Sequence, residues 1–245
     1  EYPDDCIVDF DMRLIDLFKE IDKKKLTLKM QIRQEYYRVK ELLDGKRPSR
    51  MDLFTYMDDE IYRICVSGSH AKENPFQQYL DFLYELGELS EDEQKLYAGI
   101  GREFIQTIET TEMQKVYKMP ILYSFYNHGN IRLAVTDEEV LESWKEFFDT
   151  GTNWKDFPNV NTYEDYKKVT DKQHLSKAKR MPIRFLKASG KGFFVEKDGY
   201  ALALRDEIGD VVGNMAFGEQ MGDVLGYRSL EYYRRRYKKN RSEGD

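Results

Sequence analysis

Residues 27–57 constrain the fold more than any other stretch, because they hold two amphipathic segments separated by a short basic turn. The first segment, TLKMQIRQEYYRVKELLDG, carries apolar residues at three- and four-residue steps, namely Leu28, Ile32, Tyr36, Val39 and Leu43. That spacing is typical of one face of an α-helix about four turns long. The face has to be buried against a partner, so this part of the chain is predicted to be packed helix.

A tight turn is predicted after this helix. Gly45 suits the left-handed conformation that ends helices, and Pro48 prevents the same helix from continuing. Ser49 can cap a second helix, with Asp52 in its first turn. The apolar face of this second helix consists of Leu53, Phe54 and Met57.

Two helices joined in this way form a helix-turn-helix-like corner. In DNA-binding corners the second helix presents its N-terminus to the major groove, and Lys46, Arg47 and Arg50 gather at that point here. An ordinary corner of a helical bundle with solvated charges explains the same residues, because short motifs give many false positives.

Composition indicates a folded globular protein. The chain has 245 residues, of which 40% are hydrophobic and 34% charged, and 18 Tyr and 14 Phe argue against disorder. No apolar run approaches the roughly 20 residues of a membrane helix. No signal-peptide pattern is present, and only Cys6 and Cys65 occur, which favours a reducing cytoplasm. Because the sequence starts at Glu1 without Met, we expect a piece of a longer chain.

Charge is segregated along the sequence, although the net charge is −6. Residues 23–50 contain ten basic and three acidic residues, whereas residues 51–114 contain four basic and 14 acidic ones. From residue 171 onward there are 16 basic and 11 acidic residues. Local basic patches can attract phosphates even on an acidic protein.

The predicted fold class is mainly α: a multi-helix bundle with the helix-turn-helix-like corner and a small C-terminal α+β part. Domains are expected at 1–114, which is helical, and at 115–245. In the first, the further helices are expected at 9–22, 58–66, 75–87 and, after a capping box of Ser90 and Glu93, at 91–111.

The second domain is predicted to contain two similar units. KMPILYSFYNHGNIRLAV and RMPIRFLKASGKGFFVEK align at an offset of 62 residues, each a helix followed by a strand. The first unit leads to a strand at 131–135, after which Thr136 with Glu139 caps a helix running to about Phe148. The second leads into a hairpin, FFVEKDGYALAL, with Asp198-Gly199 as its two-residue turn. A helix followed by this hairpin resembles a winged-helix wing; residues 205–221 are expected to be irregular and 222–239 helical.

No catalytic or cofactor site is predicted for this piece. The phosphate-binding pattern Gly-x-x-x-x-Gly-Lys-Ser/Thr is absent, and His70, His128 and His174 are far apart in the sequence. Glu196-Lys197 is too loosely spaced from other carboxylates for a magnesium-dependent nuclease. We expect no cofactor and no metal.

The basic clusters are the candidate sites. Tyr232, Tyr233 and Tyr237 interleave with the terminal cluster, a mixture that permits phosphate pairing and base stacking. Basic residues at a helix C-terminus are also favoured by the helix dipole alone, without any ligand. The candidate nucleic-acid contacts are Lys46, Arg47, Ser49, Arg50, Lys177, Lys179, Arg180, Lys191, Arg234, Arg235, Arg236, Lys238 and Lys239.

The order of these segments resembles the region that follows the motor domains in bacterial superfamily 2, DEAD/DEAH-box-like helicases, including type III restriction Res subunits. The resemblance is carried by VDFDMRLIDLFK, EYYRVKELLDGKRPSRMDLFTYMD, KMPILYSFYNHG, HLSKAKRMPIRFLKASGKGFF and YYRRRYKK. It implies a helicase accessory region whose ATPase motor, as an upstream partner, lies outside this sequence. It supplies no catalytic residue.

The sequence therefore predicts a non-catalytic region of a cytoplasmic helicase-like protein that contacts DNA or RNA through its basic corner, wing and final helix. Two alternatives remain open at this point. One is a docking module that packs on its own motor domains or on a protein partner, with its charges serving solubility. The other, a nuclease of unrecognised geometry, would reveal itself by magnesium-dependent cleavage.

Overall fold

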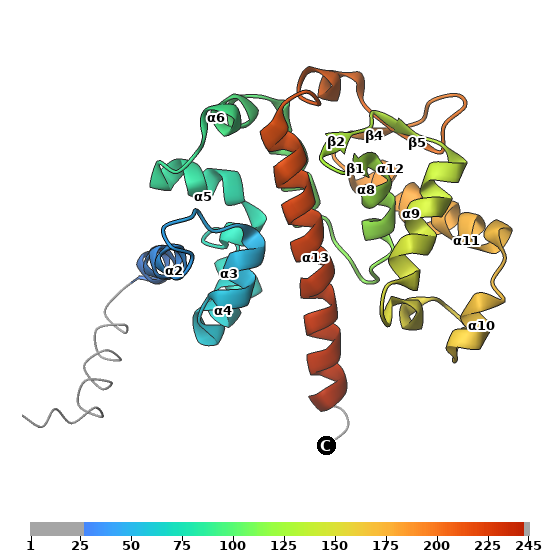
Figure 1. The fold of residues 1–245 in the computed structure, drawn as a ribbon, viewed down its shortest axis with the longest axis horizontal. Helices are drawn as coiled ribbons and strands as arrows, with labels where there is room; N and C mark the ends of the chain where they lie inside the picture. Colours follow the sequence, from blue (N-terminus) through green and yellow to red (C-terminus); the bar gives the residue numbers. More distant parts are fainter. Residues whose placement is uncertain (1–26, 243–245) are drawn as a thin grey trace, which may run out of the picture. The chain divides into compact units, whose positions relative to one another are not determined.

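A computed structural model describes residues 27–242 of this chain, with side chains as far as Tyr237. The helix predicted at 9–22 and Cys6 lie outside the described residues. The described chain is mainly helical with a small amount of antiparallel sheet, as predicted, and its contacts divide it into two compact units (Figure 1). The first unit holds the described residues up to Pro48 together with Asp52–Asn74, and the second holds Ser49–Met51 together with the chain from Pro75 onward.

The first unit contains helices at the positions that the apolar spacing predicts. They are α2 (Leu28–Leu42), α3 (Arg50–Tyr56, whose first two residues belong to the second unit) and α4 (Asp59–Cys65), followed by a 3-10 turn at Gly68–His70. The apolar face of α2 is buried at Ile32, Tyr36 and Val39, and α2 packs against α4.

A carboxylate in α2 fixes the start of α4. Glu35 is 7% exposed; its Oε2 accepts hydrogen bonds from the Asp58 N–H at 2.8 Å and from Arg38 Nη2 at 2.7 Å. Arg38 in turn donates to the Tyr56 carbonyl, which is one of the unpaired carbonyls at the end of α3. These bonds satisfy backbone groups that helix ends leave open.

The second unit contains the remaining helices. They are α5 (Tyr79–Leu86), α6 (Glu91–Ala98), α7 (Ile100–Thr110), α8 (Lys118–Phe125), α9 (Asp137–Asp149), α10 (Tyr163–Lys167), α11 (Asp171–Ala178), α12 (Arg184–Ser189) and α13 (Met215–Ser242), with 3-10 turns at Pro75–Gln77, Asn153–Asp156 and Asp206–Asp210 and a π-helical turn at Lys179–Ile183. No helix within residues 27–242 has both the length and the apolar character needed to cross a bilayer.

The two predicted helix-then-strand units meet in one small sheet. A three-stranded antiparallel sheet has the order β3-β5-β4, with β3 at Ala134–Val135, β4 at Phe194–Val195 and β5 at Leu202–Leu204. A separate two-stranded ladder joins β1 (Tyr126–Asn127) to β2 (Asn130–Ile131). The strand predicted at 131–135 is thus interrupted. The hairpin between β4 and β5 is confirmed, with Phe194 opposite Leu204 and a turn closed by the Tyr200 N–H on the Lys197 carbonyl.

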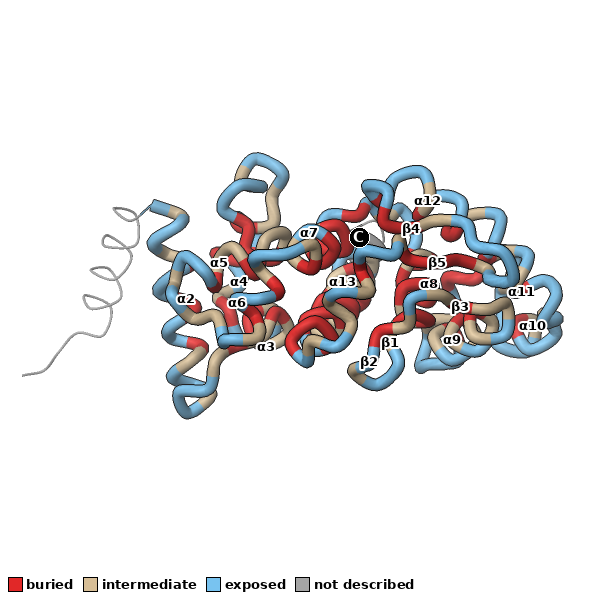
Figure 2. The backbone as a smooth tube through the Cα atoms, turned by 90° about the horizontal axis from the view of Figure 1, so that it is seen from above, coloured by how far each residue is buried: buried red, intermediate tan, exposed pale blue. Residues whose placement is uncertain are grey.

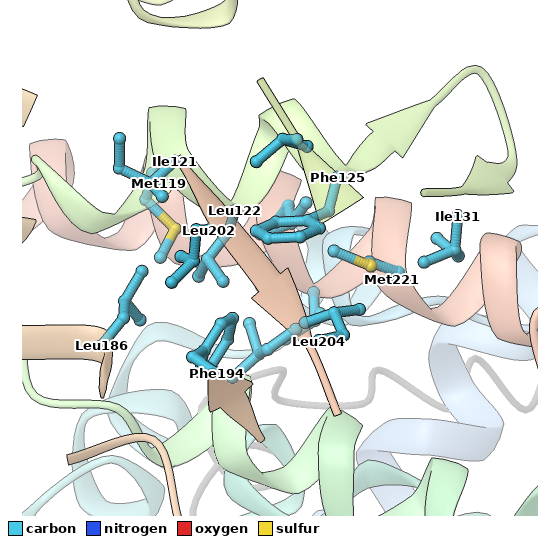
Figure 3. Packing of buried hydrophobic residues seen from close by; sticks show 14 of the residues in the cluster. Met119, Ile121, Leu122, Phe125, Ile131, Leu186, Phe194, Leu202, Leu204 and Met221 are labelled. Carbon is cyan, nitrogen blue, oxygen red and sulfur yellow. The ribbon is translucent and has the colours of Figure 1, made fainter. Parts of the chain in front are cut away.

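The core of the second unit lies between this sheet and its helices. The central strand β5 and the helix α8 are buried along most of their length (Figure 2). Figure 3 shows Met119, Ile121 and Phe125 of α8 gathered with Leu204 of β5 and Met221 of α13. Both Met-Pro-Ile segments contribute to this core, since Ile183 belongs to the same cluster.

The boundary predicted at residue 114 is wrong. Leu96, Phe104 and Ile108, from α6 and α7, lie in the same apolar cluster as Trp144 of α9. Helices on both sides of residue 114 therefore share one core, and the contacts divide the chain near residue 75 instead. The helix predicted at 91–111 is divided at Gly99, whose extended conformation interrupts it, although its capping box of Ser90 and Glu93 is confirmed.

The final helix begins earlier than the sequence predicts. Residues 215–221, expected to be irregular because of their glycines, are the first turns of α13. A Cβ at Gly218 would overlap the carbonyl oxygen of Gly129 in the β1–β2 turn, and a Cβ at Gly222 would lie 2.7 Å from the hydroxyl oxygen of Tyr126. These glycines thus allow α13 to approach the β1–β2 ladder closely rather than breaking the helix.

Candidate nucleic-acid interface

The turn between α2 and α3 has the predicted backbone. Asp44 and Gly45 have φ values of +54° and +80°, the left-handed conformation that ends a helix. Lys46 is exposed, while Arg47 and Ser49 are half-buried. Two helices and a turn therefore stand where the sequence places them; whether the corner enters a DNA groove stays a prediction.

Arg50 belongs to the interior of the second unit. Its side chain is fully buried, and its guanidinium donates to Glu109 Oε1 from Nη2 at 2.6 Å and from Nε at 3.0 Å. From Nη1 it donates to Asp223 Oδ2 at 2.8 Å and to Gln220 Oε1 at 2.7 Å. The guanidinium carbon also lies 4.5 Å from the centre of the Tyr79 ring.

The positive charge of Arg50 faces two carboxylates inside the protein, those of Glu109 and Asp223. Burial alone would lower the pKa of Arg50, but Glu109 and Asp223 outweigh it and raise the pKa. Burial raises the pKa of Glu109, against the opposing effect of Arg50. A guanidinium with no exposed surface and three side-chain acceptors cannot reach a phosphate, so the prediction of Arg50 as a nucleic-acid contact is wrong.

The basic residues near position 180 surround a groove. Lys179 pairs with Asp137, Nζ to Oδ2 at 2.6 Å, whereas Arg180 is exposed. Lys177 is half-buried with its Nζ 5.1 Å from the centre of the Tyr117 ring. Within residues 27–237, none of the ion pairs to carboxylates involves Lys172, Lys177 or Arg180.

We call this cavity, of about 610 Å³, the basic groove. Two segments line it, close to α10 and α11 in Figure 1. One segment comprises Phe157, Pro158, Asn159 and Val160, and the other comprises Asp165, Lys168, Val169, Lys172, Gln173, Ser176, Lys177 and Arg180. Its one lining carboxylate, that of Asp165, accepts a hydrogen bond from Thr162 at 2.7 Å and pairs with Lys168 at 3.5 Å.

Lys177 has positively charged neighbours and no carboxylate partner within the described residues. The pKa of Lys177 is lowered by burial and also by the positive charges of Arg180 and Lys115. Lys115 lines a second cavity of about 310 Å³, which we call the α13 hollow, formed with Met113, Gln114, Tyr232, Arg235 and Arg236. Lys177 therefore lies within electrostatic reach of residues from both cavities.

Two arginines of the terminal basic cluster, Arg235 and Arg236, form ion pairs within the protein. Arg235 pairs with Glu231, and Arg236 pairs with Asp156, whose side chain is completely buried. Asp156 Oδ1 also accepts from the Tyr232 hydroxyl at 3.2 Å, and its backbone carbonyl accepts from the Tyr117 hydroxyl at 2.7 Å. Arg234 is half-buried, and the side chains of Lys238 and Lys239 lie outside the described part of the chain.

The remaining candidate, Lys191, is exposed in the turn before β4, where it has a φ of +50°. The sequence analysis missed Lys115, Lys168 and Lys172. Lys168 and Lys172 lie in the run KKVTDKQHLSKAKR, which has six basic residues and one acidic residue. That excess of positive charge could have identified them as candidates. Only the folded chain brings this run next to Phe157 and Val160.

Three further kinds of group were considered as functional sites in the described chain: metal ligands, a reactive thiol and a histidine. No group of three or more His, Cys, Asp or Glu side chains in the described chain is placed to hold a metal ion. Burial raises the pKa of the Cys65 thiol to about 12, so it is protonated and poorly nucleophilic near neutral pH. His174 is buried and its pKa is lowered, chiefly by burial.

The chain matches no family model, no curated protein and no solved structure. A functional assignment therefore depends on the geometry of the basic groove and the α13 hollow.

Proposed function

We propose that the second unit binds nucleic acid through the basic groove without catalysing a reaction. The observation that supports this most is a cluster of cations, Lys172, Lys177 and Arg180, that no carboxylate of the described chain neutralises. Arg180 and Lys115 both lower the pKa of Lys177, so bringing these charges together has a cost in the free protein. A phosphodiester backbone would relieve that repulsion and release counterions.

In this proposal the chain is an accessory region of a helicase-like protein whose ATP-dependent motor supplies catalysis. The support is the order of segments that resembles the region after such motors. Contacts through the α2–α3 corner at Lys46 and Arg47, and through the β4–β5 hairpin near Lys191 in the manner of a wing, belong to the same proposal as secondary contacts. DNA and RNA both offer the phosphates that the groove would bind.

The test is fluorescence anisotropy with labelled DNA and RNA oligonucleotides and the purified chain, at about 50 and 200 mM salt. The variant Lys177→Glu/Arg180→Glu should bind more weakly and lose salt dependence. On duplex DNA each lost phosphate contact lowers the log–log salt slope by about 0.9.

A control with the same change in net charge is Arg63→Glu/Lys95→Glu, because both residues are exposed and lie in α4 and α6, outside the groove, the corner and the hairpin. This control should bind nearly as well as the natural sequence. The proposal is rejected if no oligonucleotide binds at the lower salt concentration, or if the groove variant and the control variant bind equally well. A docking module would then be the better hypothesis.

A further inference from the structure

The two segments that line the basic groove differ in character. One is helical and basic: Lys172, Ser176 and Arg180 follow one another at four-residue steps along α11 and the π-helical turn after it. Since a helix rises 1.5 Å per residue, each step advances by about 6 Å, and the three side chains lie in a row. This row can bind successive phosphates of one strand, with Ser176 offering a hydroxyl donor between two cations.

The other segment is mainly apolar. Phe157 is 8% exposed, and its ring contacts the rings of Tyr166, Phe148 and His174, with centroids 5.8, 5.8 and 5.0 Å away. Pro158 and Val160 beside it are half-buried. The packing under Phe157 fixes this segment, so it offers a firm apolar surface next to the cations.

Between Pro158 and Val160, Asn159 is exposed with a φ of +60°. Asn tolerates this left-handed conformation better than most residues. Its side-chain amide has both donor and acceptor groups. The segment thus combines apolar surface with one group able to pair with the edge of a base.

Resting on the proposed function, we infer that the basic groove takes a single strand of nucleic acid rather than a duplex. A duplex offers only its phosphates to such a groove, because its base faces are stacked inside, and the apolar segment would then lie against charged backbone. A single strand offers phosphates to the row from Lys172 to Arg180 and a base face to Pro158 and Val160. Binding sites for single strands commonly combine a basic groove with aromatic side chains on which bases stack. Here Pro158 and Val160 supply the apolar surface, because Phe157 is packed beneath them.

The size of the cavity agrees with this occupant. A volume of about 610 Å³ falls within the roughly 300–1,000 Å³ of small-molecule sites. That volume is suited to single nucleotide units rather than to the whole width of a duplex. An acidic peptide with apolar side chains has related chemistry, and the test below distinguishes it.

The experiment compares four labelled probes on the full chain at low salt: a 12-nucleotide thymidine strand, the matching uridine strand, a duplex, and an abasic strand of the same length. The thymidine or uridine strand should bind more tightly than the duplex and the abasic strand, by up to about fivefold, because stacking on an aromatic ring gives about fivefold or more per base and Pro158 and Val160 are not aromatic. Val160→Ser should weaken binding of the base-containing strand but leave binding of the abasic strand unchanged.

The outcomes separate this inference from the proposed function. Equal affinity for duplex and single strand, with Lys172→Glu/Arg180→Glu weakening both, would refute the single-strand inference and support nucleic-acid binding. If all four probes fail to bind, both are refuted. Displacement of the thymidine strand by a lower concentration of an alternating Glu-Leu peptide would identify an acidic peptide as the ligand and overturn the inference.

Discussion

The α2–α3 corner and the basic groove start from the same kind of sequence and end in opposite environments. Each is a short basic run beside a helix end, KRPSR in one and KAKR in the other. In the corner, Arg50 is buried against Glu109 and Asp223, whereas Arg180 in the groove is exposed. The role of a cation is thus decided by the carboxylates that the fold brings to it.

The difference follows from the cost of removing charge from water. A buried guanidinium persists only when its donors are paired, and Arg50 finds three side-chain acceptors in α7 and α13. An exposed cation needs no internal partner, so it remains accessible to an external anion. Arg50 is therefore expected to matter for stability, and Arg180 for binding.

Loss of Arg50 should have the largest effect. Arg50→Met leaves the Glu109 and Asp223 carboxylates without their counter-charge, and we expect the free energy of unfolding to fall by about 3–5 kcal/mol. Urea denaturation measures this. Lys46→Met, four residues away and exposed, is the control and should change stability by less than about 0.5 kcal/mol.

A double variant sharpens the same point. Arg50→Met/Glu109→Gln should lose less stability than the sum of the two single variants, because the second change neutralises one of the two carboxylates, that of Glu109, which the first change leaves unpaired. A loss below about 1 kcal/mol for Arg50→Met would show that the buried ion pairs do not distinguish the corner from the groove.

The position of α13 matters for the buried Arg50 and for the α13 hollow. This helix supplies Asp223 to the Arg50 cluster and Arg235 to the hollow. Gly218→Ala would force a methyl group into the carbonyl of Gly129, and we expect a loss of about 1–3 kcal/mol. The matched control is Gly226→Ala, whose Cβ would meet Met51 Sδ at 3.7 Å, an ordinary contact.

That control should be neutral or more stable by up to about 1 kcal/mol, since alanine favours helix. The two thermal denaturation curves give the answer directly. Equal effects at both positions would mean that the close approach of α13 to the β1–β2 turn is not needed for stability.

Charge reversal tests the two regions directly. Lys172→Glu/Arg180→Glu and Lys46→Glu/Arg47→Glu change net charge equally. We expect the groove pair to lower the salt slope of single-strand binding by about 1.4, two contacts at roughly 0.7 each, and the corner pair to lower it less. Anisotropy titrations at several salt concentrations measure both slopes. A larger loss for the corner pair would restore the helix-turn-helix interpretation over the groove.

The smallest expected effect concerns pH and His174, whose ring packs against Phe157, a residue that lines the basic groove. The pKa of His174 is lowered, first by burial and then by Lys145, against the attraction of Asp171 and Asp149. Below the unfolded pKa of about 6.5, His174 is protonated in the unfolded chain but remains neutral in the folded chain. Stability therefore falls as the pH drops, until the pH reaches the lower pKa of the folded chain.

The contribution is at most about 1.4 kcal/mol per pH unit. His174→Gln should reduce the loss of stability between pH 7.5 and 5.5, measured by urea denaturation at both values, while the exposed-site variant Lys46→Met should not alter that loss. If the natural sequence and His174→Gln lose the same stability over this range, the titration of His174 does not cause the pH dependence of the free energy of unfolding.

Local structure was accessible from sequence where local interactions decide it. The face of α2, the glycine turn at Gly45, the capping boxes starting at Ser90 and Thr136, and the hairpin around Gly199 all stand as predicted. In each case the determining groups lie within a few residues of one another, so periodicity and caps were sufficient.

Predictions failed where distant residues decide the outcome. The domain boundary was misplaced because α7 and α9 share a core, and no local sequence pattern indicates that contact. Gly218 was taken as a sign of irregular backbone, although Gly218 and Gly222 permit close packing of a regular helix; their four-residue spacing was the signal that could have indicated this. Arg50 was misassigned because Asp223 is 173 residues away.

The sequence by itself determined that this chain is mainly helical, where several helices such as α2 and α9 begin and end, and which segments carry positive charge. Those properties follow from backbone hydrogen bonding, side-chain periodicity and composition, which act over short distances. The tertiary structure alone decided which cations are neutralised and which remain open, because desolvation and ion pairing depend on neighbours that only folding brings together. It thereby moved the candidate interface from the α2–α3 corner to the basic groove.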